Sequence, residues 1–352
     1  MIKAKVVGAG GYGGVGITEL LLRHPETAIR ALVDVENVGT AMGTLYPHLD
    51  GFLDQVILPP DDSAAQEPAD VVFMATPDGV GMKLAGAELE KGARVIDYSG
   101  DFRFNTADAY TEYASRIGRD PAHASPELLP EAVYGLPELH RADITKKTRV
   151  VGNPGCFAVS CTLGLAPAAR EGLIEAGSLI CDCKTGVSGA GKKPNAVFHY
   201  PARYDNMNAY KLAGHQHVCE IERELSLLAG RELTVTFTAQ VVPCCRGIMS
   251  TLYGTLVAPV SEADVLKTYR EFYEEDVFVR VYESGAAVGT AQVRGTNYCA
   301  LVVSVDQRNR RLRVVSYVDN LVKGQAGSAL QNMNLLFGLP ETTGLDRPGM
   351  YP

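Results

Sequence analysis

The stretch KAKVVGAGGYGG, residues 3–14, decides how the first part of the chain folds. A short apolar-rich run leads directly into a cluster of glycines, and TELLL at residues 18–22 follows with the spacing and composition of a helix. This order predicts a strand, a glycine turn and a helix. Main-chain N–H groups and the helix dipole at such a turn can hold a pyrophosphate. The stretch therefore predicts a dinucleotide site made by Gly8, Gly10, Gly11, Tyr12, Gly13 and Gly14.

The rest of the chain separates into two patterns, and its 352 residues suit about two domains. Short apolar runs at 29–33, 71–75, 94–97 and 150–152 alternate with helical or looping segments, which predicts βαβ units and a parallel sheet. Beyond about residue 178, longer runs with period-two alternation at 234–238, 250–257, 300–305 and 312–318 predict a mixed or antiparallel sheet. The predicted fold class is α/β, with a Rossmann-type parallel-sheet domain followed by an α+β domain.

The charge and cysteine content narrow the classes of partner. Lys and Arg number 33 against 41 Asp and Glu, a net charge of −8 without a polybasic run, so a nucleic acid or an anionic membrane surface is not expected. Residues 150–169 carry no charge, but Asn153-Pro154-Gly155 and Pro167 interrupt them, which predicts a buried strand, a turn and a helix instead of a membrane span. The N-terminus has no apolar signal segment, and the eight cysteines form no Cys-x-x-Cys pair. We expect a cytoplasmic protein that acts on a small molecule.

Cys156 is the strongest candidate for a nucleophile. The segment 150–158, VVGNPGCFA, places it in the first turn of the predicted helix, directly after a strand and an Asn-Pro-Gly turn. The positive end of a helix favours the thiolate form of such a cysteine, and a thiolate can attack an acyl carbon. Cys161, Cys181, Cys183 and Cys299 are expected to be inert buried residues.

His215 and His217 lie in GHQHVCEI, residues 214–221. Side chains two positions apart on a helix point about 200° from each other, so we expect no shared metal ion. One histidine would then face the site while the other is structural. A histidine about sixty positions after a candidate thiol is the partner that a Cys/His acid–base arrangement needs, although a lone histidine is more often a surface or core residue.

Two further segments bear on nucleotide binding. Asp34, with Glu36 close by, follows the predicted strand at 29–33. An acid at this place can accept hydrogen bonds from a ribose 2′-hydroxyl, which favours NAD as the cofactor. A solvated acid at the end of a strand explains the residue equally well. Residues 186–193, GVSGAGKK, imitate a P-loop but have Lys193 where Ser or Thr would bind Mg²⁺, and Pro194 follows. A nucleotide triphosphatase is therefore disfavoured, but Ser188 and the main chain of this loop could bind a phosphate.

Taken together, the segments resemble the N-acetyl-γ-glutamyl-phosphate reductase family, relatives of aspartate-semialdehyde dehydrogenase. The matches occur in order along nearly the whole chain, at residues 8–14, 97–103, 134–138, 152–157, 185–191, 215–221, 246–248, 295–297 and 319–324. The resemblance implies domains at 1–152 for the dinucleotide, at 153–318 for catalysis and dimerisation, and a C-terminal helix at 319–352 that returns to the first domain. It also implies a homodimer or homotetramer.

The same resemblance implies roles for individual residues. Cys156 is implied to be the nucleophile and one of the two histidines the acid–base group, with His217 favoured over His215 by position. Cofactor contacts are implied for Ser188, Gly189 and Asn320 in addition to the glycine turn and Asp34, and substrate contacts for Arg103, Asn153, Ser188 and Arg246. Arg103 and Arg246 would bind the phosphate and carboxylate through the guanidinium fork, and a surface ion pair is the alternative for each.

Four departures from the family pattern stand out: Val159, Cys219, Gly13 and the segment 34–36. The family tends to carry Ser and Arg at 34–36, suited to the 2′-phosphate of NADP. The resemblance therefore implies NADP(H), whereas Asp34 and Glu36 make NAD(H) plausible.

The implied reaction is the NAD(P)H-dependent reduction of an acyl phosphate to a semialdehyde and phosphate through a Cys156 thioester. No metal ion is implied. Two alternatives remain open: a reductase of a carrier-linked aminoadipyl phosphate, and a non-catalytic dinucleotide-sensing protein.

Overall fold

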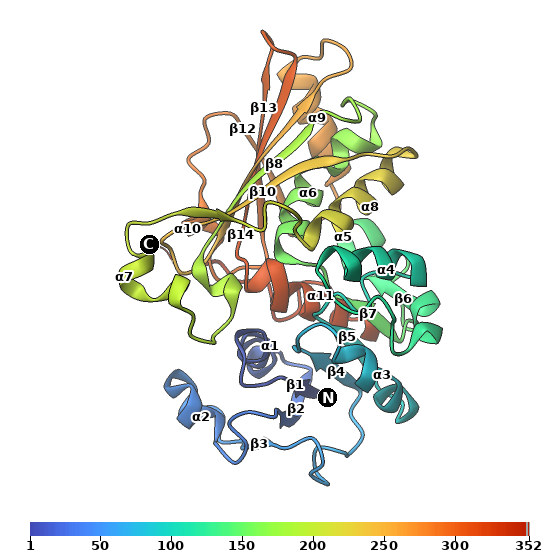
Figure 1. Ribbon diagram of the computed structural model, residues 1–352, viewed down its shortest axis with the longest axis vertical. Helices are drawn as coiled ribbons and strands as arrows, with labels where there is room; N and C mark the ends of the chain where they lie inside the picture. Colours follow the sequence, from blue (N-terminus) through green and yellow to red (C-terminus); the bar gives the residue numbers. More distant parts are fainter. Residues whose placement is uncertain (350, 352) are drawn as a thin grey trace. The chain divides into compact units, whose positions relative to one another are not determined.

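The computed structural model describes residues 1–349 and 351. The chain forms two compact units (Figure 1). The first comprises residues 1–115, 120–154 and 325–346, and the second comprises residues 116–119, 155–324 and the last described residues from 347 onward. The predicted α/β fold class is confirmed, because each unit is a sheet with packed helices.

The first unit contains a seven-stranded sheet in the order β3-β2-β1-β4-β5-β7-β6. All of its strand pairs are parallel. The bounds are β1 Ile2–Val7, β2 Thr27–Val33, β3 Ile57–Leu58, β4 Val71–Met74, β5 Arg94–Asp97, β6 Ala132–Tyr134 and β7 Val150–Gly152. All four residues of β4 are buried, as expected for a parallel strand covered on both faces.

The first helix begins earlier than the apolar spacing suggested. α1 spans Tyr12–Arg23 because the glycines of this segment enter its first turns, and Gly14 and Val15 are buried there. In this unit, the two-residue β3 and the three-residue β6 were not predicted. β7 is the last strand of this sheet in chain order, as expected, but β6 pairs with it and makes it an internal strand.

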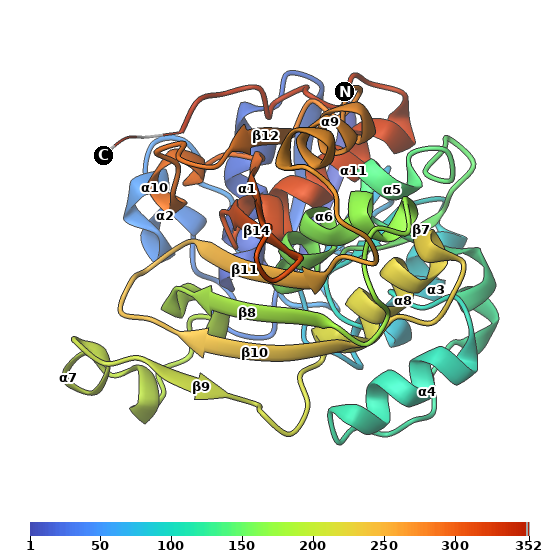
Figure 2. The same cartoon turned by 90° about the horizontal axis from the view of Figure 1, so that it is seen from above.

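The second unit contains a mixed sheet in the order β12-β13-β14-β11-β8-β10-β9. Its parallel pairs are β10 with β8 and β12 with β13, and the other pairs are antiparallel. Figure 2 shows β11, β8, β10 and β9 side by side in this order. The bounds are β8 Leu179–Thr185, β9 Asn208–Tyr210, β10 Val235–Val241, β11 Ile248–Thr255, β12 Val279–Glu283, β13 Cys299–Asp306 and β14 Arg311–Val318. The four predicted strands differ from these bounds by one to three residues.

Three helices pack against this second sheet: α6 Cys156–Arg170, α8 His217–Ala229 and α9 Glu262–Phe272. α6 is buried over nearly its whole length, which explains why residues 156–169 carry no charge. Ser261 caps α9, because its hydroxyl accepts a hydrogen bond from the Asp264 N–H at 3.1 Å. The helix ends at Phe272.

The remaining elements are α2 Met42–Leu45, α3 Gly81–Glu90, α4 Ala107–Arg116, α5 Pro137–His140, α7 Tyr200–Arg203, α10 Thr290–Val293, α11 Gly327–Phe337, a π-helix at Val322–Ala326, and 3₁₀ helices at Pro47–Leu49, Pro126–Glu131, Val187–Ala190 and Ala196–Phe198. Among them, α11 is almost entirely buried in the first unit. Within residues 1–349 and 351, no helix has the length and apolar character needed to cross a membrane.

Candidate active site

The glycine turn of the first unit is a close approach of main chains. Gly8 has a φ of +80°, and a Cβ placed on it would lie 2.4 Å from the Ala75 carbonyl oxygen. A Cβ on Gly14 would lie 2.2 Å from the Gly8 carbonyl oxygen. Neither end of the turn therefore has room for a side chain. Between Gly8 and Gly14, Gly11 is the N-cap residue of α1 and has an extended backbone. Such a turn lets a phosphate approach the main-chain N–H groups, so the residues present fit the pyrophosphate of a dinucleotide.

Asp34 follows the last residue of β2 and turns back to the glycine turn. Its Oδ2 accepts a hydrogen bond from the Gly10 N–H at 2.8 Å, and its Oδ1 accepts from the N–H groups of Val35 and Glu36. A carboxylate offers about four acceptor positions, so these three bonds hold the group in place and leave room for one further donor. The carboxylate therefore sits at the carboxyl end of β2 beside the phosphate-binding turn.

Cys156 is the first residue of α6, as the sequence predicted. It is half-buried, unlike Cys161, Cys181, Cys183 and Cys299, which are fully enclosed as expected. Because the N-cap residue Gly155 has no side chain, the first turn of α6 is open to close packing. Cys156 is thus half-buried and placed at the positive end of a fifteen-residue helix.

Two other parts of the second unit approach this helix start. A Cβ placed on Gly155 would lie 2.2 Å from His217 Nε2, so the imidazole ring of His217 rests directly on the residue before Cys156. A Cβ on Gly324 would lie 2.7 Å from the Cβ of Cys156, so the main chain at Gly324 covers another side of the cysteine. Cys156 and His217, which are separated by about sixty residues in sequence, are brought together.

The expectation that the two histidines point in opposite directions is wrong. α8 begins at His217, so His215 precedes the helix, and the two rings pack edge to face with centroids 4.8 Å apart. The His217 N–H donates a hydrogen bond to His215 Nδ1 at 3.2 Å, which leaves no proton on that nitrogen. Burial, with a smaller effect of the Lys211 charge, lowers the pKa of His215 to about 3. His215 is therefore a neutral, structural residue that orients the start of α8.

Glu220 is a residue of this site that sequence reasoning did not single out. It lies three positions after His217 on α8, is fully buried, and its Oε2 accepts a hydrogen bond from the Gly155 N–H at 3.0 Å. This bond ties the first turn of α8 to the N-cap of α6, and so fixes the histidine relative to the thiol. The sequence feature that could have pointed to Glu220 is its position: it is an acidic residue in the first turn of a helix, one turn after a candidate histidine.

Arg103 and Asn153 lie in the first unit and are both buried. The Arg103 guanidinium donates from Nε to the Asn153 carbonyl at 2.8 Å and from Nη2 to the Tyr98 carbonyl at 2.6 Å, so the alternative of a surface ion pair is wrong. The Asn153 side chain donates to the Gln325 carbonyl at 3.0 Å and accepts from Asn332 at 3.3 Å. Both residues hold the loops at the carboxyl end of the sheet, and their contact with a substrate stays a prediction.

A buried carboxyl group accompanies Arg103 in the same loop. Burial and the neighbouring Asp101 raise the pKa of Asp97 to about 8, although hydrogen bonds from Ser99 and the charge of Arg103 act against the shift. Asp101 accepts hydrogen bonds from the N–H groups of Gly79 and Met82, at the start of α3. These carboxyl groups therefore fix the loops that follow β4 and β5.

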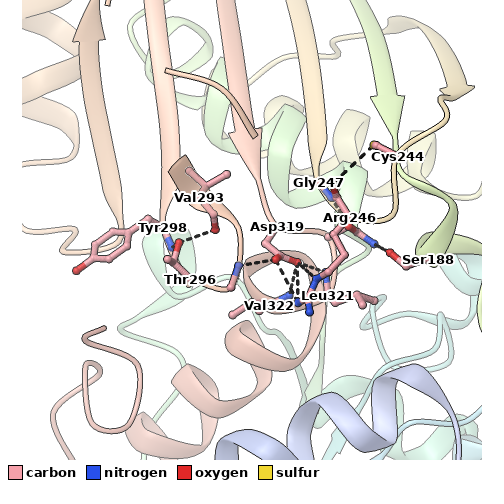
Figure 3. Close-up of polar contacts among 12 residues, drawn as sticks. Ser188, Cys244, Arg246, Gly247, Val293, Thr296, Tyr298, Asp319, Leu321 and Val322 are labelled. Atoms are coloured by element: carbon pink, nitrogen blue, oxygen red, sulfur yellow. Dashed lines mark hydrogen bonds and ion pairs between the residues drawn. The ribbon is translucent and has the colours of Figure 1, made fainter. Parts of the chain in front are cut away.

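In the second unit, Ser188, Asn320, Arg246 and Asp319 form one network. Figure 3 shows Arg246 and Asp319 facing each other, with Ser188 near Gly247. Asn320 Nδ2 donates to the Ser188 hydroxyl at 3.0 Å, and Asn320 Oδ1 accepts from the Gly247 N–H at 2.8 Å. Arg246 forms an ion pair with the fully buried Asp319 at 3.1 Å, and it remains half-exposed. A Cβ on Gly189 would lie 3.9 Å from Asn320 Nδ2, which places that glycine beside the same network.

The loop that imitates a P-loop has a different structure. β8 leads into a four-residue 3₁₀ helix, Val187–Ala190, and Gly191 then takes a φ of +82°. A second 3₁₀ helix at Ala196–Phe198 comes next in the described chain, where a P-loop would continue into a long helix. The loop instead presents Ser188 to Asn320.

Comparisons with known proteins show which family the chain resembles. Residues 3–147 match the family model of the semialdehyde dehydrogenase NAD binding domain, and residues 156–320 match that of the semialdehyde dehydrogenase dimerisation domain. Proteins named N-acetyl-gamma-glutamyl-phosphate reductase from Citrifermentans bemidjiense and Symbiobacterium thermophilum are 42% and 44% identical; the matches cover 100% of this chain and 100% and 99% of theirs.

Solved structures share the fold at low identity. Aspartate semialdehyde dehydrogenase II of Vibrio cholerae, complexed with ASA, has a TM-score of 0.71 at 15% identity, covering 96% of this chain and 98% of that one. The aspartate semialdehyde dehydrogenase of Candida albicans with NADP has a TM-score of 0.68 at 17% identity, with the same coverage of both chains. The full-length identity to the curated relatives shows the closer relationship: the chain belongs to the N-acetyl-γ-glutamyl-phosphate reductase family of semialdehyde dehydrogenases.

Proposed function

We propose that the chain reduces N-acetyl-γ-glutamyl phosphate to N-acetyl-glutamate semialdehyde and phosphate. The observation that carries the proposal is the position of His217, which packs on Gly155, the residue before the half-buried Cys156 at the start of α6. In addition, the chain is more than 40% identical along its whole length to relatives named for this reaction. The class of enzyme is a phosphorylating semialdehyde dehydrogenase.

Cys156 is the proposed nucleophile. Its thiolate attacks the γ-acyl carbon, the bond from that carbon to the phosphate oxygen breaks, and inorganic phosphate leaves with the bonding electron pair. A thioester remains on Cys156. The bound nicotinamide supplies the hydride equivalent that reduces the acyl group to the aldehyde level.

His217 is the proposed acid–base group, because the lowered pKa of His215 makes that imidazole a weak proton acceptor near pH 7. The imidazole of His217 accepts the thiol proton before attack and returns a proton when the aldehyde leaves the sulfur. His215 holds the main chain of His217 through its Nδ1, and Glu220 holds Gly155. These two residues position the reacting pair and do not react themselves.

The residues that we propose for cofactor binding are those of the glycine turn, Tyr12, Asp34, Ser188, Gly189 and Asn320. The Asp34 carboxylate lies where it can accept a hydrogen bond from a ribose hydroxyl and would repel a 2′-phosphate, which supports NADH as a cofactor in addition to the family's NADPH. Glu36, two residues further, adds negative charge.

Arg246 is the proposed partner of a substrate anion, and Arg103, Asn153 and Ser188 are proposed to support substrate binding. The half-exposed Arg246 can bind an anion while Asp319 holds it. We also infer a homo-oligomer, supported by the match of residues 156–320 to a dimerisation domain.

A spectrophotometric assay tests this function in the reverse direction. N-acetyl-glutamate semialdehyde, phosphate and either NAD⁺ or NADP⁺ are mixed with the protein, and absorbance at the reduced nicotinamide band is followed. We expect turnover that requires phosphate. Turnover only with a carrier-linked aminoadipate semialdehyde, or cofactor binding without turnover, contradicts the proposal.

A further inference from the structure

A pocket of about 280 Å³ lies in the second unit beside the Asp319 network. It is lined by Cys244, Cys245, Arg246, Thr290, Ala291 and Arg294. The two charged groups in this lining are both guanidinium groups, and Thr290 adds a hydroxyl. A guanidinium binds a carboxylate or phosphate through two parallel hydrogen bonds, so this lining favours a small anionic group.

The fully buried Asp319 organises both arginine-bearing segments (Figure 3). Its carboxylate accepts from Arg246 Nη2 at 3.1 Å, and it also accepts from the Gly295 N–H at 2.7 Å, next to Arg294. The same group accepts from the Leu321 N–H at 2.8 Å. The Arg246 side chain, which Asp319 holds, therefore loses little conformational entropy when it binds a ligand.

Thr290 packs against the segment that carries Arg246. Gly247 has a φ of +110°, and a Cβ placed on it would lie 2.8 Å from the Cβ of Thr290, so the threonine packs directly on the main chain that follows Arg246. Arg246 and Thr290 are therefore held by Asp319 and by packing on Gly247, and the main chain next to Arg294 is held by the bond from the Gly295 N–H to Asp319.

The network that holds the pocket residues is also connected to the nucleophile Cys156. The Gly324 N–H donates to the Asp319 carbonyl at 2.9 Å, and Gly324 lies against Cys156. Asp319 thus joins the arginine pocket to the main chain that covers the reacting thiol.

We propose that Arg294 and Thr290, together with Arg246, form a subsite for the α-carboxylate of the acyl substrate and so determine its specificity; this rests on the function proposed above. A carboxylate is favoured over the phosphate because Asp319 offsets one of the two positive charges, which suits a monoanion better than a dianion. At about 280 Å³, the pocket is at the lower limit for a ligand site, so it suits one end of a small substrate.

The test compares two substrates and four proteins. N-acetyl-glutamate semialdehyde and its α-carboxamide are assayed with phosphate and cofactor for the wild type, Arg294→Ala, Arg294→Lys and the control Arg308→Ala. Arg308 is a suitable control because its side chain is 87% exposed in the turn between β13 and β14. A charged hydrogen bond of about 1.5–3 kcal/mol corresponds to roughly a 10- to 150-fold change in kcat/KM.

We expect Arg294→Ala to lose this factor with the carboxylate substrate and less than about threefold with the carboxamide, while Arg294→Lys loses an intermediate amount. Thr290→Val should weaken the carboxylate substrate in the same selective way. Equal losses with both substrates, or a raised KM for phosphate alone, would overturn the subsite.

A binding measurement separates the subsite from the proposed function. N-acetyl-glutamate, which has no aldehyde, is titrated calorimetrically into the wild type and Arg294→Ala. Weaker binding by the variant supports the subsite even where the wild type fails to turn over the semialdehyde, which is the failure of the proposed function. Equal binding by both proteins, with normal wild-type turnover, refutes the subsite and leaves the proposed function in place.

Discussion

Replacing Gly155 by alanine tests the arrangement of thiol and histidine directly. Gly155 has a φ of −72° and a ψ of 146°, which any residue adopts, so the substitution introduces no backbone strain. Its new methyl group would lie 2.2 Å from His217 Nε2 and 2.3 Å from His217 Cδ2. Because these distances are far below van der Waals contact, the imidazole ring must move away from the start of α6.

We expect Gly155→Ala to reduce kcat much more than it reduces the stability of the protein. A general acid–base group contributes about 10²–10⁴-fold, so kcat should fall at least about 100-fold if His217 is displaced. Overpacking at a buried position destabilises by about 1–3 kcal/mol, which leaves most molecules folded. The assay measures kcat with N-acetyl-glutamate semialdehyde and phosphate, and thermal unfolding of the same samples.

Two further variants make the experiment decisive. Gly177→Ala is the matched control, because a Cβ at that position has no neighbour within 4 Å, and it should retain kcat. The double variant Gly155→Ala/His217→Ala should be no slower than His217→Ala, since both changes remove the same group. Near-normal turnover of folded Gly155→Ala, or losses that multiply in the double variant, would refute the reasoning.

Three other predictions concern the nucleophile, the cofactor and pH. Cys156→Ser should lose more than about 100-fold in kcat and keep the wild-type affinity for NADH in a fluorescence titration, because a hydroxyl is a much weaker nucleophile than a thiolate; substantial turnover would exclude Cys156. The wild type should use NADH with a kcat/KM comparable to that with NADPH, and Asp34→Ser should shift the ratio toward NADPH by about tenfold as the repulsion of the 2′-phosphate disappears; a wild type that strongly prefers NADPH contradicts this role of Asp34. The pKa of His215 is lowered to about 3 in the folded protein, so the unfolded chain binds a proton that the folded chain does not, and stability falls as pH drops from about 6.5 toward 3. Between pH 7 and 4.5 this amounts to about 2–3 kcal/mol, which urea unfolding should show for the wild type and which His215→Gln should largely remove; an equal loss in the variant would assign it to other groups.

The sequence was most informative where a local pattern has a local physical cause. The glycines at 8–14 predicted a tight turn, and the structure gives the reason: Gly8 and Gly14 have no room for a Cβ. The turn before Cys156 predicted the start of a helix, and α6 begins there. The ordered motifs also indicated the family, which the comparisons confirmed. In the glycine turn and at the start of α6, the residues that make the structure are neighbours in the chain.

The tertiary structure decided which distant residues meet. The helical spacing of His215 and His217 suggested opposite directions, but the helix begins only at His217, so the rings touch and one of them is kept neutral by burial. The bond from Gly155 to Glu220 and the packing of Gly324 on Cys156 join segments 65 and 168 residues apart, and no local propensity encodes them. Periodicity and capping follow from interactions within one turn of backbone, whereas the reactivity of a thiol or an imidazole depends on the charges, dipoles and desolvation that the folded chain brings around it.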